Sequence, residues 1–539
     1  MSALLLCNGY VIDAGGVVHD SVLISDGIVS AIGRHADIAA QFGGLSSAQA
    51  PRVVDLAGSV VTAAFVDAHV HLTATGQLVS GVDLRNVRSA AEILTAVGRA
   101  AEVSEPGIVI GHGWDETQFE DQTLPTADEL QAVTGREVYL TRIDVHSALV
   151  SRSLLRNLPE LESLPGFSDD GRLTRAAHGA ARQHVFSALS DAQRSRVQIS
   201  ALRGCAEAGI VSVHENAGPV VSSLDDLRSA LALGQRADLP EVIGYWGELH
   251  SAQRIRDIGA WGAAGDLFID GSLGSHTAHL CQDYVDMPTV GASYVTTEEL
   301  TEHFVQCLKA GVQGGVHAIG DAAIASAISA MSTAVEQQRR LGVREHIQMP
   351  GQWRIEHLEM PSAEHIRLCV ELGVIASVQP QFDALWGGVE GMYERRLGRA
   401  RARAMNPFAS LLNAGVHVAF GSDSPVTPAN PWRNVYAAMS HHEASQRITA
   451  AQAFVAHTAS AAMAAVPPRG YETHRRVTAT LKVGEPADIA VWPDSDGLTN
   501  LGASGVDSAD VVAALAHAEP LALATFRAGN LIHDNGITT

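Results

Sequence analysis

The sequence is short of cysteine and has no long apolar run, and each shortage argues against a class of protein. The 539 residues include five cysteines, none spaced as a Cys-X-X-Cys pair, which argues against a disulfide framework and a cysteine zinc site. No uninterrupted apolar stretch approaches the roughly 20 residues of a membrane-spanning helix. The first nine residues have no basic segment and only a very short apolar run, so we expect an opening strand rather than a signal peptide. A cytoplasmic location is the resulting expectation.

Basic residues are also scarce. Lysine and arginine total 37 against 59 aspartates and glutamates, which gives a formal net charge of −22. A surface this acidic repels phosphate backbones and anionic lipid, so we expect neither a nucleic-acid partner nor a membrane partner. Hydrophobic residues make up 46% of the chain. That fraction is enough for a large core and excludes disorder as a global description.

The middle of the chain alternates apolar strand-like segments with helical ones, such as 297–310 and 322–341. This alternation predicts a parallel sheet, and eight such units fit a closed (β/α)8 barrel of the TIM type. An open doubly wound sheet is the alternative, but the Gly-rich phosphate fingerprint that it needs after the first strand is absent. The predicted strands are Val61–His71, Gly209–Glu215, Val242–Glu248, Asp266–Gly271, Gly311–His317, Trp353–His357, Val374–Gln379 and Val416–Asp423.

The two ends of the chain resemble each other in pattern. Residues 1–60 and 467–539 both carry short alternating strands with turn signals, and we expect them to pair into one small β domain. The barrel then spans residues 61–466. The gap between its first two strands is too long for one helix, so residues 72–208 hold an insertion. An insertion after a barrel strand lies over the mouth where barrels keep their active sites.

A histidine pair ends the first predicted barrel strand, in the run Phe65–Leu72. Residues two apart in a strand point the same way, so His69 and His71 face the same side. Two neutral imidazoles so placed can ligate one zinc-like ion at about 2.0–2.1 Å. Asp67 has the same parity and either orients a ligand or is a buried core carboxylate. The pair by itself is a weak signal.

Three further strand ends strengthen this signal. His317 closes the fifth predicted strand, His357 the sixth and Asp423 the eighth. The carboxyl ends of barrel strands meet at one ring, so these side chains converge with the first pair. A metal there lowers the pKa of bound water toward about 7, and Asp423 is the best candidate to take its proton. Taken singly, each residue has the alternative of packing or capping a helix.

Several phrases together resemble the amidohydrolase superfamily, and more closely its YtcJ-like branch, amidohydrolase family 3, which includes N-substituted formamide deformylases. The resemblance implies a (β/α)8 barrel, a composite β-sandwich of both termini, and hydrolysis of amide or related C–N bonds at one or two divalent metals, commonly zinc. It also implies a small-molecule substrate and leaves a homodimer open. The phrases are Phe65–Leu72, Gly113–Glu116, Asp270–Ser275, Val316–Asp321, Arg354–His357, Val374–Pro380, Gly421–Val426 and Pro486–Ile489.

The resemblance also implies roles for the histidines. His69 and His71 bind the more buried metal, and Asp423 ligates it and shuttles the proton. His317 and His357 bind a second metal, or steer substrate if only one metal is present.

The sequence departs from the family at one ligand. The superfamily often has a carboxylated lysine on the fourth strand that bridges two metals, but Asp266 stands where that lysine belongs. Either the site holds one metal or another group forms the bridge. Glu215, at the end of the second strand, and Asp266 itself are the two candidates. The alternative for Glu215 is a salt-bridged residue of the rim.

Six residues are candidates to contact the substrate. A strand-like segment of the insertion carries two of them, of which Arg142 would pair with a substrate carboxylate or form a structural ion pair with Asp144 or Asp115. Two others follow the seventh strand and either line an apolar pocket or cover the rim. The six are Trp114, Asp115, Arg142, His146, Gln379 and Trp386.

The leading functional hypothesis is a metal-dependent amidohydrolase acting on a small N-acyl or N-formyl compound. A metal-dependent deaminase of a cyclic amine is the second, because it uses nearly the same ligands. A non-catalytic binding protein on a barrel is the third, and the intact ligand set speaks against it.

Overall fold

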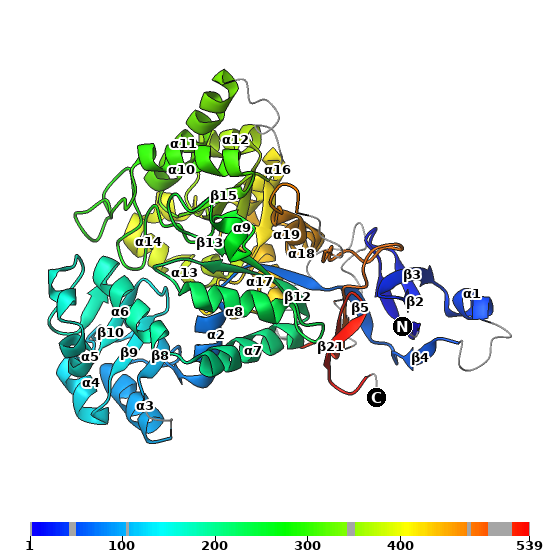
Figure 1. Cartoon of the computed structure of the whole chain (residues 1–539), viewed down its shortest axis with the longest axis horizontal. Coiled ribbons are helices and arrows are strands. Elements are labelled where there is room, and N and C mark those ends of the chain that lie inside the picture. Colours follow the sequence, from blue (N-terminus) through cyan, green and yellow to red (C-terminus); the bar gives the residue numbers. More distant parts are fainter. Residues whose placement is uncertain are drawn as a thin grey trace.

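The computed structural model describes residues 3–42, 50–103, 107–341, 351–471, 476–493, 498 and 520–537. Three sheets organise the chain, as Figure 1 shows: a parallel barrel sheet, a sheet in the inserted segment and a sheet built from both ends of the chain. The predicted fold class, a (β/α)8 barrel with an insertion after its first strand, is confirmed. Among the described helices, none has both the length and the apolarity needed to cross a membrane.

The barrel has eight strands, each paired in parallel with the next. Its last strand returns to the first: Asp423 N donates to His69 O at 2.8 Å, and His71 N donates to Ser424 O at 2.9 Å. Gly421 permits this approach, since a Cβ there would lie 2.5 Å from His69 N. The strands are β6 (Phe65–Val70), β12 (Ile210–Ala217), β13 (Glu241–Trp246), β14 (Gly262–Ala263), β15 (Gln313–Ala318), β16 (Trp353–His357), β17 (Val374–Val378) and β18 (His417–Phe420).

Amphipathic helices cover the outside of the barrel. The helix α10 (Thr297–Ala310) is typical: Thr296 and Glu299 form a capping box at its start, and Gly311 ends it in the left-handed region with φ 65°. Its apolar face joins the main core cluster with the barrel strands. The other covering helices include α7 (Asp191–Glu207), α8 (Leu224–Gly234), α11 (Asp321–Arg340), α12 (Ala363–Leu372), α16 (Phe408–Ala414), α17 (Pro431–Met439), α18 (Ala450–Ala456) and α19 (Ala459–Ala464).

Two predicted strands need correction. The segment Asp266–Gly271 is a loop, and the fourth strand is the short β14 before it; one bridge, Phe268 to His317, ties the loop to β15. Two backbone hydrogen bonds still join the loop to β15, from Ile269 N to His317 O and from His317 N to Leu267 O. Asp270 adds to them by accepting from three backbone N–H groups of neighbouring segments. The first predicted strand is two strands, of which β5 (Val60–Ala63) belongs to the terminal sheet and only β6 to the barrel.

The insertion forms its own five-stranded sheet, drawn in blue to cyan in Figure 1. Helix α2 (Leu72–Ser80) leads into it and packs on α7. The strands are β7 (Val82–Asp83), β8 (Val109–Trp114), β9 (Val138–Arg142), β10 (Ser147–Val150) and β11 (Arg172–Thr174), with helices α3 (Ala90–Val103), α4 (Ala127–Thr134), α5 (Arg152–Asn157) and α6 (Arg175–Ser187).

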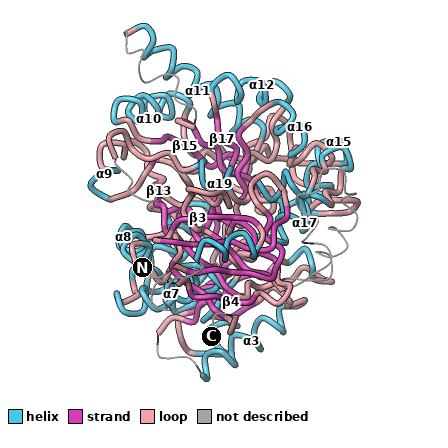
Figure 2. The backbone as a smooth tube through the Cα atoms, turned by 90° about the vertical axis from the view of Figure 1, so that its right-hand side faces the viewer, coloured by secondary structure: helices cyan, strands magenta, loops and turns pink. Residues whose placement is uncertain are grey.

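Both ends of the chain contribute to the third sheet, in the order β21-β20-β19-β5-β1-β2-β3, with β4 also paired to β1. Figure 2 shows these strands facing the viewer, and their blue and red ends lie together in Figure 1. Residues 499–519 of the predicted C-terminal part lie outside the described residues. The strands are β1 (Leu4–Ile12), β2 (Val18–Ser25), β3 (Ile28–Gly33), β4 (Arg52–Asp55), β19 (Ile489–Trp492), β20 (Ala524–Arg527) and β21 (Asn530–Asp534).

Candidate metal centre

The carboxyl end of β6 presents a histidine pair to a carboxylate across the barrel seam. His69 Nε2 lies 3.4 Å from Asp423 Oδ1, and His71 Nε2 lies 3.1 Å from the same oxygen. All three side chains are buried. This arrangement is one of two groups among the described residues that can hold a metal ion.

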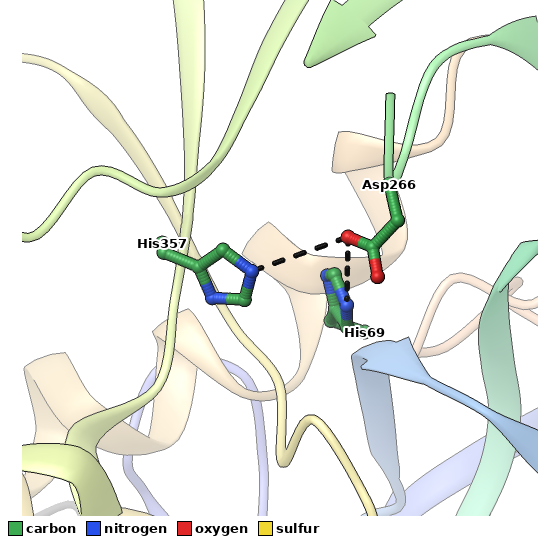
Figure 3. A group of neighbouring side chains, drawn as sticks. All are labelled: His69, Asp266 and His357. Carbon is green, nitrogen blue, oxygen red and sulfur yellow. Dashed lines mark ion pairs between the residues drawn. The ribbon is translucent and has the colours of Figure 1, made fainter. Parts of the chain in front are cut away.

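Asp266 builds the second group from the loop after β14. Its Oδ1 lies 3.6 Å from His69 Nε2 and 4.0 Å from His357 Nε2, and Figure 3 shows both rings turned toward that oxygen. Its Oδ2 lies 3.2 Å from His71 Nε2, and its Oδ1 lies 3.8 Å from His317 Nδ1. The loop therefore brings Asp266 among all four histidines expected at the barrel mouth.

The polar atoms that meet here lack hydrogen bonds. His69 Nε2, Asp266 Oδ1, His317 Nδ1 and Asp423 Oδ1 are buried, and none has a hydrogen-bond partner among the described residues. Such atoms are costly to leave unsatisfied unless something else binds them. Four ligands at about 2.0–2.2 Å from a tetrahedral zinc stand roughly 3.4 Å from one another. The His69–Asp423 and His69–Asp266 separations, 3.4 and 3.6 Å, match that spacing, so the residues fit a divalent metal.

Neighbouring side chains orient two of the histidines. His69 Nδ1 lies 2.8 Å from Glu356 Oε2, and His357 Nδ1 lies 2.8 Å from Gln379 Oε1. These oxygens only accept, so each Nδ1 carries the hydrogen and each Nε2 keeps its lone pair for a metal. Gln379, expected at the substrate, thus supports a histidine instead.

Glu356 was missed by sequence reasoning. It is fully buried inside the barrel and forms an ion pair with Arg354. The sequence did carry a signal, because Arg354 and Glu356 alternate on the inward face of β16, where an apolar pair is usual. Two opposite charges at that spacing indicate an internal salt bridge.

The carboxylates make the site strongly attractive to positive charge. Burial by itself lowers the pKa of His71, but the nearby Asp266 and Asp423 outweigh it and raise that pKa to about 10. Burial raises the pKa of Asp266, yet the charge of His69 and the proximity of His317 and His71 hold it well below its usual range. A metal competes with protons for such a site.

Two of the candidate ligands have a strained backbone. His357 has φ 71° and Asp423 has φ 54°, both in the left-handed region. Non-glycine residues rarely adopt this conformation, and functional sites are where such strain concentrates. Here it turns both side chains inward at their strand ends.

Glu215 lies beside this cluster without joining either metal-capable group. Its Oε2 accepts a 2.7 Å hydrogen bond from Leu72 N at the start of α2, and burial raises its pKa to about 7. Asp67 likewise bonds to backbone, accepting from Ser422 N at 2.8 Å and from His69 N at 3.2 Å. It therefore fastens the barrel seam.

A cavity of about 780 Å³ opens above the cluster. His71, Asp266, His317, His357 and Asp423 all contribute to its wall. The remainder is largely apolar, and the insertion covers one side of it. The apolar and aromatic lining includes Phe268, Leu273, Ile319, Phe382, Trp386, Met392, Tyr393 and Val426.

The structure brings two of the six expected substrate residues to this cavity, His146 and Trp386. Trp114, Asp115 and Arg142 are not among the lining residues. Trp114 is buried in the core of the insertion, where its indole donates to Leu140 O at 2.9 Å.

Arg142 forms a structural ion pair, which was the alternative to pairing with a substrate carboxylate. Its guanidinium contacts Asp115, Glu116 and Asp144 at 2.9, 2.9 and 3.0 Å. Asp144 in turn accepts from Ser272 Oγ at 2.8 Å, which ties the insertion to the loop after β14. Arg142 is therefore held by three carboxylates, and it is not among the residues that line the cavity.

Comparison with known proteins agrees with this geometry. The sequence profile described as the Amidohydrolase family matches residues 52–532. The chain belongs to the amidohydrolase family. Members of this superfamily are metal-dependent, which agrees with the two ligand groups at the barrel mouth, and the chain is a hydrolase.

Relatives of this amidohydrolase family member cover most of its length. It is 25% identical to the putative amidohydrolase YtcJ of Bacillus subtilis, over 79% of this chain and 81% of that protein. It is 23% identical to an N-substituted formamide deformylase of Arthrobacter pascens, over 86% of this chain and 90% of that protein. It is also 27% identical to the protein LONG AFTER FAR-RED 3 of Arabidopsis thaliana, over 86% of this chain and 83% of that protein.

Solved structures share the fold. An uncharacterized metal-dependent hydrolase from Pyrococcus horikoshii superposes with a TM-score of 0.71 at 25% identity, covering 92% of this chain and 98% of that one. A second uncharacterized metal-dependent hydrolase, from Pyrococcus furiosus, superposes with a TM-score of 0.68 at 24% identity. The match covers 91% of this chain and 98% of that one.

Proposed function

We propose that this amidohydrolase cleaves the C–N bond of a small N-formyl or N-acyl compound with a divalent metal, zinc first among the candidates. The observation that carries the proposal is the set of unsatisfied histidine and carboxylate atoms at the base of a largely apolar cavity. The similarity to a formamide deformylase supports the bond class.

The residues then take the following roles. His69, His71 and Asp423 hold the first metal, and His317 and His357 with Asp266 hold a second metal or steer the substrate carbonyl. Bound there, a divalent metal polarises a carbonyl and lowers the pKa of water toward about 7. Asp423 reaches the cavity wall, so its carboxylate accepts the proton of the attacking water and delivers it to the leaving nitrogen.

We further propose that Asp266, rather than Glu215, replaces the lysine of other family members. Asp266 Oδ1 is unsatisfied and lies within 4.0 Å of three histidine nitrogens, whereas Glu215 already bonds to Leu72 N. Asp266→Ala should lower the bound zinc per chain, and Glu215→Gln should leave it unchanged. The opposite pattern in elemental analysis of the purified variants would give the role to Glu215.

The function is tested by a hydrolysis screen of zinc-loaded and chelator-treated protein. N-formyl amines, N-acyl amino acids and cyclic amides are the probes, with formate, free amine and ammonia as the readouts. We expect formate or free amine from the loaded protein alone, restored by adding Zn²⁺ after chelation. Ammonia from cyclic amines would point to the deaminase instead, and no turnover with no bound metal would point to a binding protein.

A further inference from the structure

The insertion places two buried arginines near the cavity, and they differ in one respect. Arg142 contacts three carboxylates. Arg182, on α6, is 7% exposed and forms no ion pair with any described residue. Its Nη2 donates to Val145 O and its Nε lies 3.5 Å from Tyr139 Oη, while no hydrogen bond to a described residue engages Nη1.

Arg182 lines the main cavity. Its neighbours in the wall include His146 and His178. An imidazole carries no negative charge in either protonation state, so these rings offer no counter-charge. Asp144 is the acid of this stretch of wall, but it is already bound by Arg142, Ser272 and Ser275. The protein therefore leaves the Arg182 charge uncompensated.

A buried guanidinium without a counter-ion is costly, and an anion bound beside it removes that cost. The planar fork of arginine suits a carboxylate, which it can bind through two parallel hydrogen bonds. The position also suits a substrate group, because the ring of His146, in the same wall as Arg182, lies 5.5 Å from the ring of His317 in the metal-capable cluster.

We propose that Arg182 binds a carboxylate of the substrate, so that the substrates are N-formyl or N-acyl amino acids with an apolar side chain. The apolar side chain lies against the aromatic wall, and the amide faces the histidine cluster. The part of this inference that names the hydrolysed substrate rests on the proposed function. The part that places a carboxylate site at Arg182 does not.

Binding is tested without turnover. Calorimetry on the full-length, zinc-loaded protein compares 3-phenylpropanoate with its neutral isostere 3-phenylpropanamide. Arg182→Met should weaken the acid by about 10- to 100-fold and leave the amide within about twofold. Arg228→Met is the matched control, because that arginine lies on α8 with a 56% exposed side chain and should change neither affinity.

An acid affinity that Arg182→Met leaves unchanged, or an equal loss for acid and amide, would overturn the proposal. If the variant does not fold, crystals of the unaltered protein with 3-(4-bromophenyl)propanoate decide instead, since bromine scattering fixes the orientation. A carboxylate on Arg182 supports the proposal, and a carboxylate on the metal cluster overturns it.

Turnover separates this inference from the proposed function. N-formylphenylalanine and N-formyl-2-phenylethylamine differ by the carboxylate alone, and Arg182→Met should raise KM about 10- to 100-fold for the first and leave the second unchanged. If neither compound is cleaved by the unaltered protein, the reaction is wrong and the calorimetry still decides the anion site. If both are cleaved with the same KM change, the carboxylate assignment is wrong.

Discussion

Two buried charged clusters lie near the same cavity, one in the insertion and one at the barrel mouth, and they are built differently. In the insertion, Arg142 sits among three carboxylates at hydrogen-bonding distance. At the barrel mouth, histidines and two aspartates stand 3.1 to 4.0 Å apart, with several of their facing atoms unbonded. The first cluster is complete without a ligand and the second is not.

The contrast shows how to separate structural from functional charge. Both clusters are deeply buried, so burial does not distinguish them. What differs is whether each polar atom has a protein partner. Satisfied networks hold a fold together, whereas unsatisfied buried atoms that converge on one point indicate a ligand.

The largest expected effect is loss of turnover in Asp423→Asn. Without a carboxylate to accept and return the proton, kcat should fall by about 10²- to 10⁴-fold. Formate release measures it, and an unchanged melting temperature shows that the fold persists. Activity near that of the unaltered protein would remove Asp423 from proton transfer.

The complete cluster should behave in the opposite way. Arg142→Met strands buried carboxylates and should cost about 3–5 kcal/mol of unfolding free energy, measured by urea titration, while the folded protein keeps its zinc. Arg236→Met, at a pair with a 43% exposed arginine, should cost about 0–1 kcal/mol. If Arg142→Met kept full stability but lost its zinc, the Arg142 cluster would serve the metal site rather than the fold, and the contrast between the two clusters would be wrong.

A smaller effect is expected behind the metal site. Glu356→Gln weakens the support of His69 Nδ1 and should lower zinc affinity by about 10- to 100-fold, measured by competition with a chelator. Glu364→Gln, on the outer helix α12 with a 61% exposed carboxylate, is the control. Equal affinities in the two variants would show that Glu356 serves the barrel core alone.

The smallest effect is a pH dependence of the complete cluster. Burial raises the pKa of Asp144, but the charge of Arg142 and the bond from Ser272 hold it well below its usual range. Its stabilisation is therefore present above the unfolded pKa of about 3.9 and is lost as pH falls. The stability gap between the unaltered protein and Asp144→Asn, about 1–2 kcal/mol at neutral pH, should shrink from pH 6 to pH 3. A constant gap would contradict this assignment.

The convergence of the side chains at the barrel mouth could be predicted from the sequence because strand parity and strand ends are local properties. His69 and His71 share a face by the two-residue repeat of a strand, and His317, His357 and Asp423 meet because parallel strands end at one ring. These rules need no knowledge of loops. The eight-unit alternation was likewise enough for the barrel.

Side-chain positions in the loops and in the insertion could not be predicted from strand parity and strand ends. Asp266 reaches the cluster through an irregular loop, where no periodicity fixes side-chain direction. Gln379 was expected at the substrate but bonds to His357, a contact between neighbouring strands that needs coordinates. Arg142 and Arg182 look alike in sequence, and only their partners separate an ion-paired residue from an unpaired one.

Anomalous diffraction at the zinc edge, on crystals grown with Zn²⁺, tests the central claim most directly. We expect a peak between His69, His71 and Asp423, within reach of Asp266, and no peak at the Arg142 cluster. A barrel mouth without a peak, or a zinc ion held by Glu215 away from these residues, would contradict it.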